Sequence, residues 1–131
     1  MKILIVDDDF TNRILLQEFL KTYGTHHLAV TGAEAVLAVK QALEAKEPYH
    51  LICLDIMMPE MDGQAALKEI RALEKTAAIK PAKQAKIIMI SALDDVGNIM
   101  KSFKGLCDTY LVKPLNKQHV LQKLRELDLI C

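Results

Sequence analysis

The chain has 131 residues, of which 51% are hydrophobic and 5% aromatic, and its 17 basic and 17 acidic side chains cancel to a formal net charge of zero. A chain of this length buries roughly two-thirds of its unfolded surface, so it needs no disulfide or metal merely to fold. The balanced charge excludes a general attraction to nucleic acid or to an anionic membrane, and no apolar run approaches the ~20 residues of a membrane span. Three cysteines without paired C-x-x-C spacing favour reduced thiols and a cytoplasmic location.

Short aliphatic runs alternate along the chain with segments whose apolar residues follow helical spacing. Continuous apolarity predicts strands that are buried on both faces, as in a parallel sheet covered by helices. In chain order, the sequence predicts strand 3–6, helix 14–20, strand 28–30, helix 36–43, strand 51–54, helix 67–73, strand 87–90, helix 99–106, strand 110–112 and helix 120–127. This order indicates an α/β fold, a doubly wound five-stranded parallel sheet with helices on both faces.

Several residues indicate where the helices begin and end. Asp9 and Asn116 are suited to cap the first and last helices, and the glycines Gly24 and Gly105 are suited to end the helices before them. The basic, Ala-rich stretch 75–86, interrupted by a proline, is interpreted as a helix end followed by an exposed connector.

Polar and ionic side chains follow the predicted strands. Asp7 and Asp8 come after the first, Asp55 after the third, Ser91 after the fourth and Lys113 after the fifth. Each has an ordinary explanation alone, such as a favourable helix start or a solvated lysine. Because the carboxyl ends of parallel strands meet at one edge of a sheet, we expect these side chains to lie together and to form a site.

This set of side chains suits phosphoryl transfer. Converging carboxylates need a hard dication such as Mg²⁺. A lysine ammonium can pair with one phosphoryl oxygen, and a serine hydroxyl can hydrogen-bond to another. An aspartate can act as the nucleophile and form an aspartyl-phosphate, but composition and spacing alone do not say which aspartate does so.

Four motifs resemble the receiver domains of response regulators in two-component signalling: ILIVDDD, LDIMMPEMDG, IIMISA and TYLVKP. The match runs from Lys2 to about Leu127, and LDIMMPEMDG is its most specific part. The resemblance implies a single receiver domain over residues 1–131 of the single-domain chemotaxis type. It also implies a flavodoxin-like (β/α)5 fold with strand order 2-1-3-4-5.

The resemblance further implies a role for each residue of the candidate site. Asp55 would be the phosphoacceptor and Lys113 the phosphate-sensing cation, joined to Pro114 by a cis peptide bond. Ser91 would be the switch hydroxyl and Tyr110 the aromatic switch residue. The implied cofactor is Mg²⁺, with the ligands Asp7, Asp8, Asp55 and the backbone carbonyl of Met57.

The implied partner is a sensor histidine kinase or a histidine phosphotransfer protein, whose phosphohistidine donates to Asp55, followed by an unknown downstream protein. The chain would be a signalling switch that catalyses its own phosphorylation and dephosphorylation, without separate substrate turnover. Ile99, Phe103 and Tyr110 would belong to the surface that changes on phosphorylation. Met57 and Leu93 are apolar where many receivers carry polar groups that position the hydrolytic water, which predicts slow self-dephosphorylation.

An alternative from another class remains open. The run DDDFT at residues 7–11 also fits the D-x-D-x-T signature of haloacid-dehalogenase-like phosphohydrolases. In that interpretation Asp7 would be the nucleophile and Asp9 the general acid. Such enzymes also need an acidic pair on a strand end after the lysine, whereas here only Glu126 and Asp128 follow, within a predicted helix. This alternative also leaves LDIMMPEMDG unexplained.

Overall fold

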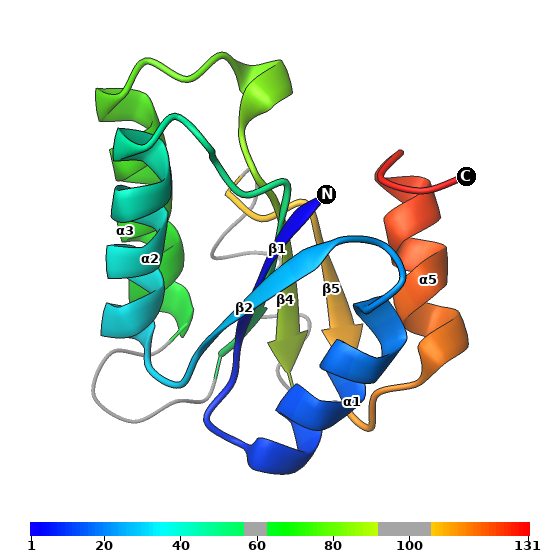
Figure 1. Cartoon of the computed structure of the whole chain (residues 1–131). Coiled ribbons are helices and arrows are strands. Elements are labelled where there is room, and N and C mark those ends of the chain that lie inside the picture. The colour runs from blue at the N-terminus through cyan, green and yellow to red at the C-terminus, as the bar shows by residue number, and fades with distance from the viewer. Residues whose placement is uncertain (57–62, 92–105) are drawn as a thin grey trace.

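The computed structural model describes residues 1–56, 63–91 and 106–131. Its strands form one parallel sheet in the order β2-β1-β3-β4-β5 (Figure 1). They are β1 (Lys2–Val6), β2 (Thr25–Ala29), β3 (Leu51–Asp55), β4 (Lys86–Ser91) and β5 (Thr109–Val112). The α/β fold class and the strand order 2-1-3-4-5 are therefore confirmed.

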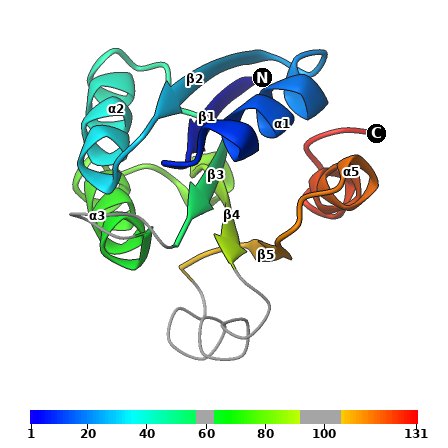
Figure 2. The ribbon, with the colours of Figure 1, turned by 90° about the horizontal axis from the view of Figure 1, so that it is seen from below.

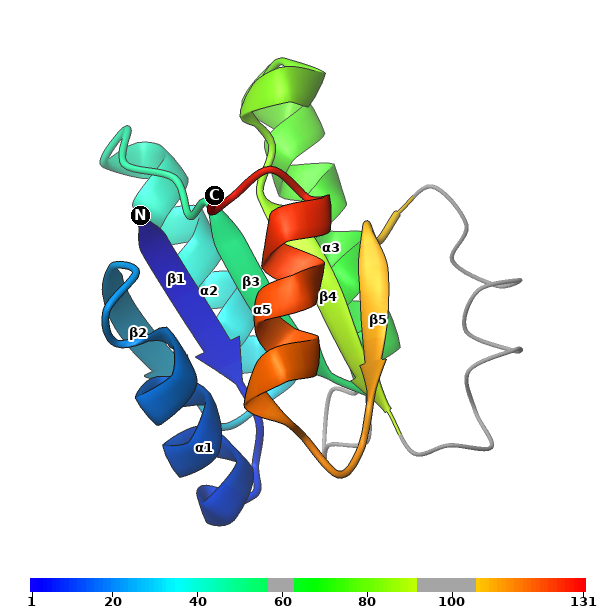
Figure 3. The same ribbon diagram turned by 90° about the vertical axis from the view of Figure 1, so that its right-hand side faces the viewer.

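Helices cover both faces of this sheet. Figures 2 and 3 show α1 (Phe10–Leu20) and α5 (Lys117–Glu126) on one face, with α2 (Gly32–Glu44) and α3 (Gly63–Thr76) on the other. The predicted helical segment 99–106 lies outside the described residues, except for its last residue. None of the helices in the described ranges is long and apolar enough to cross a membrane.

Two apolar layers hold the helices to the sheet, because successive strand residues point to opposite faces. The layer under α2 and α3 includes Leu4, Val6, Ile52, Leu54, Ile87 and Met89. The layer under α1 and α5 includes Ile3, Ile5, Leu51, Cys53, Ile88 and Ile90. All of these side chains are fully buried, as the continuous aliphatic runs predict.

The second strand differs from its prediction. The sequence predicts a strand at residues 28–30 that is buried on both faces, whereas β2 runs from Thr25 to Ala29 and buries only Ala29. The reason is its place at the edge of the sheet, where it pairs with β1 alone and can carry exposed histidines. Gly24 does not end α1, which stops at Leu20. A Cβ at Gly24 would lie 1.9 Å from the carbonyl oxygen of Met1, so glycine is required where the chain enters β2.

The two predicted helix caps are confirmed. Asp9 accepts a hydrogen bond from the backbone N–H of Thr11 at 3.0 Å. Asn116 accepts from the backbone N–H groups of Gln118 and His119, at 2.8 and 3.3 Å. These bonds satisfy N–H groups that the first turn of a helix leaves without an intrahelical partner.

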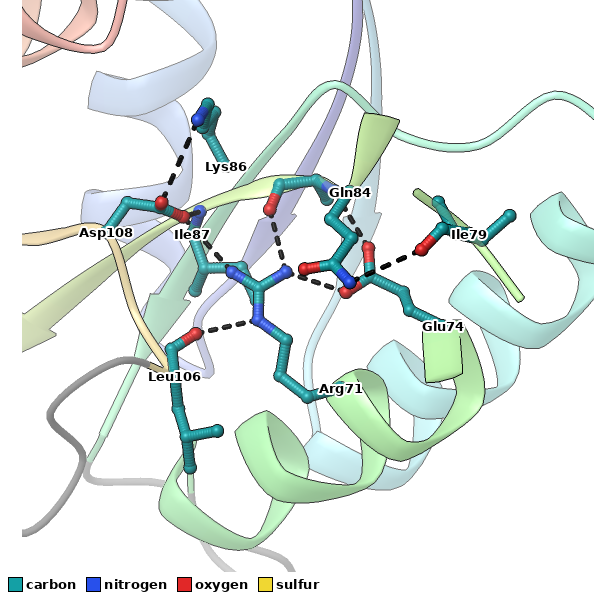
Figure 4. A network of polar contacts seen from close by, with 9 residues as sticks. Arg71, Glu74, Ile79, Gln84, Lys86, Ile87, Leu106 and Asp108 are labelled. Carbon is teal, nitrogen blue, oxygen red and sulfur yellow. Dashed lines mark hydrogen bonds and ion pairs between the residues drawn. The ribbon is translucent and has the colours of Figure 1, made fainter. Parts of the chain in front are cut away.

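A half-buried arginine, Arg71, joins α3 to the amino ends of β4 and β5 (Figure 4). The guanidinium of Arg71 donates to the carbonyl oxygens of Leu106 and Ala85, at 2.7 and 2.9 Å. It also donates to Glu74 Oε1 at 2.7 Å and to Asp108 Oδ2 at 3.1 Å. Arg71 therefore links three segments that lie up to 37 residues apart in the sequence.

The two carboxylates of this network also bind backbone. Glu74, which is 2% exposed, accepts the N–H of Ala85 at 2.8 Å, and Asp108 accepts the N–H of Ile87 at 2.8 Å. These contacts hold the starts of β4 and β5, the strands whose other ends lead to Ser91 and Lys113. The network thus helps to set where those two residues lie.

Replacing Arg71 by methionine should lower the free energy of unfolding by about 3 kcal/mol, because Glu74 would stay buried without its positive partner. The double variant Arg71→Met, Glu74→Gln should recover much of this loss, since a glutamine oxygen can still accept from Ala85. Urea unfolding measures both changes. Lys75→Met, at an exposed position of the same helix, is the matched control; an equal loss there would contradict the interpretation.

Candidate functional site

Side chains from four strand ends meet at the carboxyl edge of the sheet. Asp7 and Asp8 follow β1, Asp55 and Ser91 are the last residues of β3 and β4, and Lys113 follows β5. The parallel register continues through these positions: the N–H of Lys113 donates to the carbonyl of Ser91 at 2.9 Å. The expectation that these residues share one edge is therefore met.

Three of these residues form an acidic cluster. One carboxylate oxygen from each of Asp7, Asp8 and Asp55 lies within 4.8 Å of the other two. Asp7 and Asp55 are 0% and 1% exposed, whereas Asp8 is exposed. The cluster thus has a buried floor and one carboxylate open to solvent. Met57, the fourth implied ligand, lies outside the described residues.

Asp7 is the electrostatically strained member of the cluster. Its Oδ1 accepts a hydrogen bond from the backbone N–H of Asp9 at 2.8 Å, while its Oδ2 is buried and has no hydrogen-bond partner in the described part of the chain. Burial raises the pKa of Asp7 to about 6, and the negative charge of Asp55 adds to the rise, against the opposing hydrogen bond from Asp9.

These features fit a magnesium ion. Mg²⁺ takes oxygen ligands, usually one or two carboxylates together with water. The cluster offers three carboxylates, and one of their buried oxygens has no partner within residues 1–56, 63–91 and 106–131. A dication there would satisfy the Asp7 oxygen and offset the repulsion among the acids.

One cation completes the described site. The Nζ of Lys113 lies 3.2 Å from Oδ2 of Asp55, and the two side chains are 30% and 1% exposed. The peptide bond between Lys113 and Pro114 is cis, as the resemblance implies. Lys113 thus lies beside the buried carboxylate of Asp55, and part of the lysine side chain remains exposed to solvent.

The two residues that the resemblance assigns to a switch, Ser91 and Tyr110, lie on β4 and β5. The hydroxyl oxygen of Ser91 is buried and makes no hydrogen bond to any of the described residues. Tyr110 is half-buried on β5, where it pairs with Met89 of β4. Ile99, Phe103 and Leu93 lie outside the described residues.

Sequence reasoning missed two supports of the site. Gly63 begins α3 so close to β3 that a Cβ would lie 2.2 Å from the carbonyl oxygen of Asp55, which explains the glycine that closes LDIMMPEMDG. Arg13 donates from Nη1 to the carbonyl oxygen of Asp7 at 2.8 Å. The place of Gly63 at the end of a specific motif could have indicated that glycine is required there. Nothing in the sequence pattern distinguishes Arg13 from a surface residue of α1.

The sequence model of a family described as response regulator receiver domain matches residues 3–125. The chemotaxis protein CheY of Bacillus subtilis is 31% identical over 130 residues, which cover 95% of each chain. The transcriptional regulatory protein ZraR of Salmonella typhimurium is 33% identical over 125 residues. The chain spans only 25% of ZraR, and 47% of the probable transcriptional regulator ycf27 of Cyanophora paradoxa, which is 30% identical.

Solved structures show the same fold. A chain of the CheX-CheY-BeF3-Mg²⁺ complex from Borrelia burgdorferi superposes with a TM-score of 0.79 at 32% identity, covering 98% of this chain and 89% of that one. The receiver domain of the sensor histidine kinase PA1611 from Pseudomonas aeruginosa, with a magnesium ion coordinated in its active-site cleft, gives a TM-score of 0.74 at 25% identity. That match covers 95% of this chain and 94% of the other.

Asp7 should make the metal-free protein less stable as pH rises. Its pKa is about 6 in the folded chain and about 4 when unfolded, so the folded state binds more protons between these values and stability falls as pH rises through them. Asp7→Asn should therefore raise the free energy of unfolding at pH 7 without Mg²⁺, by on the order of 2 kcal/mol, and flatten its dependence between about pH 4 and 6.

Urea unfolding with EDTA across this pH range measures the effect. Mg²⁺ should stabilise the wild type more than the variant, because the variant lacks one anionic ligand. Asp8→Asn, at the exposed carboxylate, is the matched control and should change the metal-free stability less. A less stable Asp7→Asn protein at pH 7 without Mg²⁺ would contradict this account of the cluster.

Proposed function

The chain belongs to the family of response regulator receiver domains, and we propose that it works as a signalling switch with Asp55 as its phosphoacceptor. Receiver domains act as switches rather than as metabolic enzymes. The observation that carries the proposal is the position of Asp55, which is buried at the end of β3, 3.2 Å from the ammonium of Lys113 and within the acidic cluster.

The surroundings of the aspartates favour Asp55 as the nucleophile. Asp7 Oδ1 already accepts the backbone N–H of Asp9, and no lysine is paired with this carboxylate among the described residues. Asp8 is exposed and begins the turn into α1. Asp55 lies beside a lysine that can transfer its ammonium contact to an incoming phosphoryl oxygen.

The proposed donor is a phosphohistidine on a sensor histidine kinase or a histidine phosphotransfer protein. An oxygen of Asp55 attacks phosphorus in line, the new P–O bond forms, and the P–N bond breaks with its electron pair on the imidazole nitrogen. Lys113 stabilises the negative charge on the phosphoryl oxygens during transfer. Mg²⁺ held by Asp7, Asp8, Asp55 and the proposed Met57 carbonyl would neutralise charge on these carboxylates and on the phosphoryl group.

The product adds a charge of roughly −1.5 to −2 and new acceptor oxygens next to Ser91. Its buried hydroxyl, without a partner among the described residues, is suited to hydrogen-bond to one of them. Tyr110 would then turn inward, and the surface formed by β5, α5 and the helix that the sequence predicts at residues 99–106 would change for a downstream partner. The Borrelia complex of CheX and CheY with BeF3 and Mg²⁺ is a partner-bound example in the same family.

The haloacid-dehalogenase-like alternative finds less support. It requires Asp7 as nucleophile, although Oδ1 of Asp7 already accepts the backbone N–H of Asp9. It also requires an acidic pair at a strand end after Lys113. Glu126 instead ends α5, and Asp128 follows that helix.

Acetyl phosphate with Mg²⁺ should phosphorylate the wild type, and Asp55→Asn should abolish the label because the nucleophilic carboxylate is lost. Intact-protein mass spectrometry measures the modification, and EDTA should prevent it. Glu69→Gln removes an exposed carboxylate from α3 and serves as the control for acid loss. Label that survives Asp55→Asn but disappears in Asp7→Asn would favour the phosphohydrolase instead.

The phosphorylated protein should lose its label slowly once the donor is removed, because Met57 and Leu93 offer no polar group to the hydrolytic water. Timed mass spectra give the half-life. Substituting Met57 by asparagine and Leu93 by glutamate should shorten that half-life. Equal half-lives in the wild type and the double variant would refute the assignment of slow hydrolysis to these two positions.

A further inference from the structure

A lysine of α5 reaches the aromatic ring of the proposed switch residue. The Nζ of Lys123 lies 5.6 Å from the ring centroid of Tyr110, within the range of a cation–π contact. We propose that Lys123 is a positioning residue that holds Tyr110 in its unphosphorylated place and thereby opposes phosphorylation. This inference rests on the proposed function, because it assigns a regulator to the same switch.

The contact forms around the edge of the sheet. Tyr110 packs against the apolar layer under α2 and α3, whereas its neighbour Leu111 packs into the layer under α1 and α5. β5 is the last strand on its side of the sheet, so a long side chain from α5 can pass its edge to the ring. A groove of about 660 Å³ runs between β5 and α5, and both Tyr110 and Lys123 line it.

Lys123 is suited to such a contact because its side chain is only partly exposed. Its side chain is 29% exposed, and its second partner is Glu126, whose Oε2 lies 3.6 Å from Nζ and which is itself 50% exposed. An ion pair this exposed contributes little free energy, so Glu126 does not draw the ammonium strongly away from the ring. The ring and the exposed carboxylate therefore share the lysine.

The contact differs between the two states of the proposed switch. It exists while the ring lies at the edge of the sheet, and it is lost when Tyr110 turns inward after Ser91 has moved toward the phosphoryl group. An interaction present in one state only shifts the equilibrium toward that state. Removing Lys123 should thus favour the inward state and, by reciprocity, tighten the binding of a phosphoryl mimic at Asp55.

The sign of this effect separates the proposal from simple electrostatics. Beryllofluoride is an anion, and the loss of a nearby positive charge by itself weakens the binding of an anion. Restraint of Tyr110 by Lys123 predicts the opposite result. A cation–π contact at a partly exposed site corresponds to a change in affinity of about two- to five-fold.

The experiment measures the affinity for beryllofluoride in the presence of Mg²⁺ by calorimetry, with fluorine NMR as a check on binding. Lys123→Met should bind about two- to five-fold more tightly than the wild type, whereas Lys123→Arg, which keeps a cation over the ring, should not. This increase in affinity should persist in a Tyr110→Phe background, which keeps an aromatic ring, and should vanish in a Tyr110→Leu background, which has none. Lys117→Met removes an exposed lysine from the same helix and is the matched charge control.

Unchanged or weaker binding by Lys123→Met overturns the inference, as does an equal gain in Lys117→Met or a gain that survives Tyr110→Leu. A second readout needs no phosphoryl mimic: the ring resonances of Tyr110 in the free protein should shift in Lys123→Met and stay in place in Lys117→Met. Failure of the proposed function would look different, since the wild type would then bind no beryllofluoride, or Asp55→Asn would bind it equally well.

Discussion

An excess of buried negative charge at one edge of the sheet governs the candidate site. Asp7 and Asp55 are both withdrawn from water, Asp8 adds a third carboxylate nearby, and Lys113 is the cation paired with Asp55. Desolvation and repulsion appear together as the raised pKa of Asp7. The same imbalance makes this edge of the sheet suited to a dication, whose charge would offset that of the carboxylates.

The two ends of β4 and β5 are built in opposite ways. At their amino ends the Arg71 network pairs the carboxylates of Glu74 and Asp108 with the guanidinium and with backbone N–H groups. At their carboxyl ends the hydroxyl of Ser91 is buried without a partner among the described residues. The amino ends of these strands are thus held by a paired network, whereas the carboxyl end of β4 carries a polar group without a partner among the described residues.

Much of the fold could be predicted because its signals are local. The central strands coincide with continuous aliphatic runs, and the caps at Asp9 and Asn116 follow from side chains that bond within their own helix turn. β2 was misplaced because its histidines give no apolar signal, and its position follows from pairing with β1. The strand-end rule located the site, since parallel strands bring Asp55, Ser91 and Lys113 to one edge whatever the loops do.

The sequence by itself determined the alternation of strands and helices and the chemistry at the strand ends, because periodicity and residue type act over short stretches of chain. Only the tertiary structure decided that Asp7 is buried and Asp8 exposed, although the two are identical neighbours in the sequence. It also decided that Arg71 meets Asp108 and that Lys123 reaches Tyr110. Burial, desolvation and long-range hydrogen bonds depend on which remote segments pack together. Local patterns in the sequence do not show which segments these are.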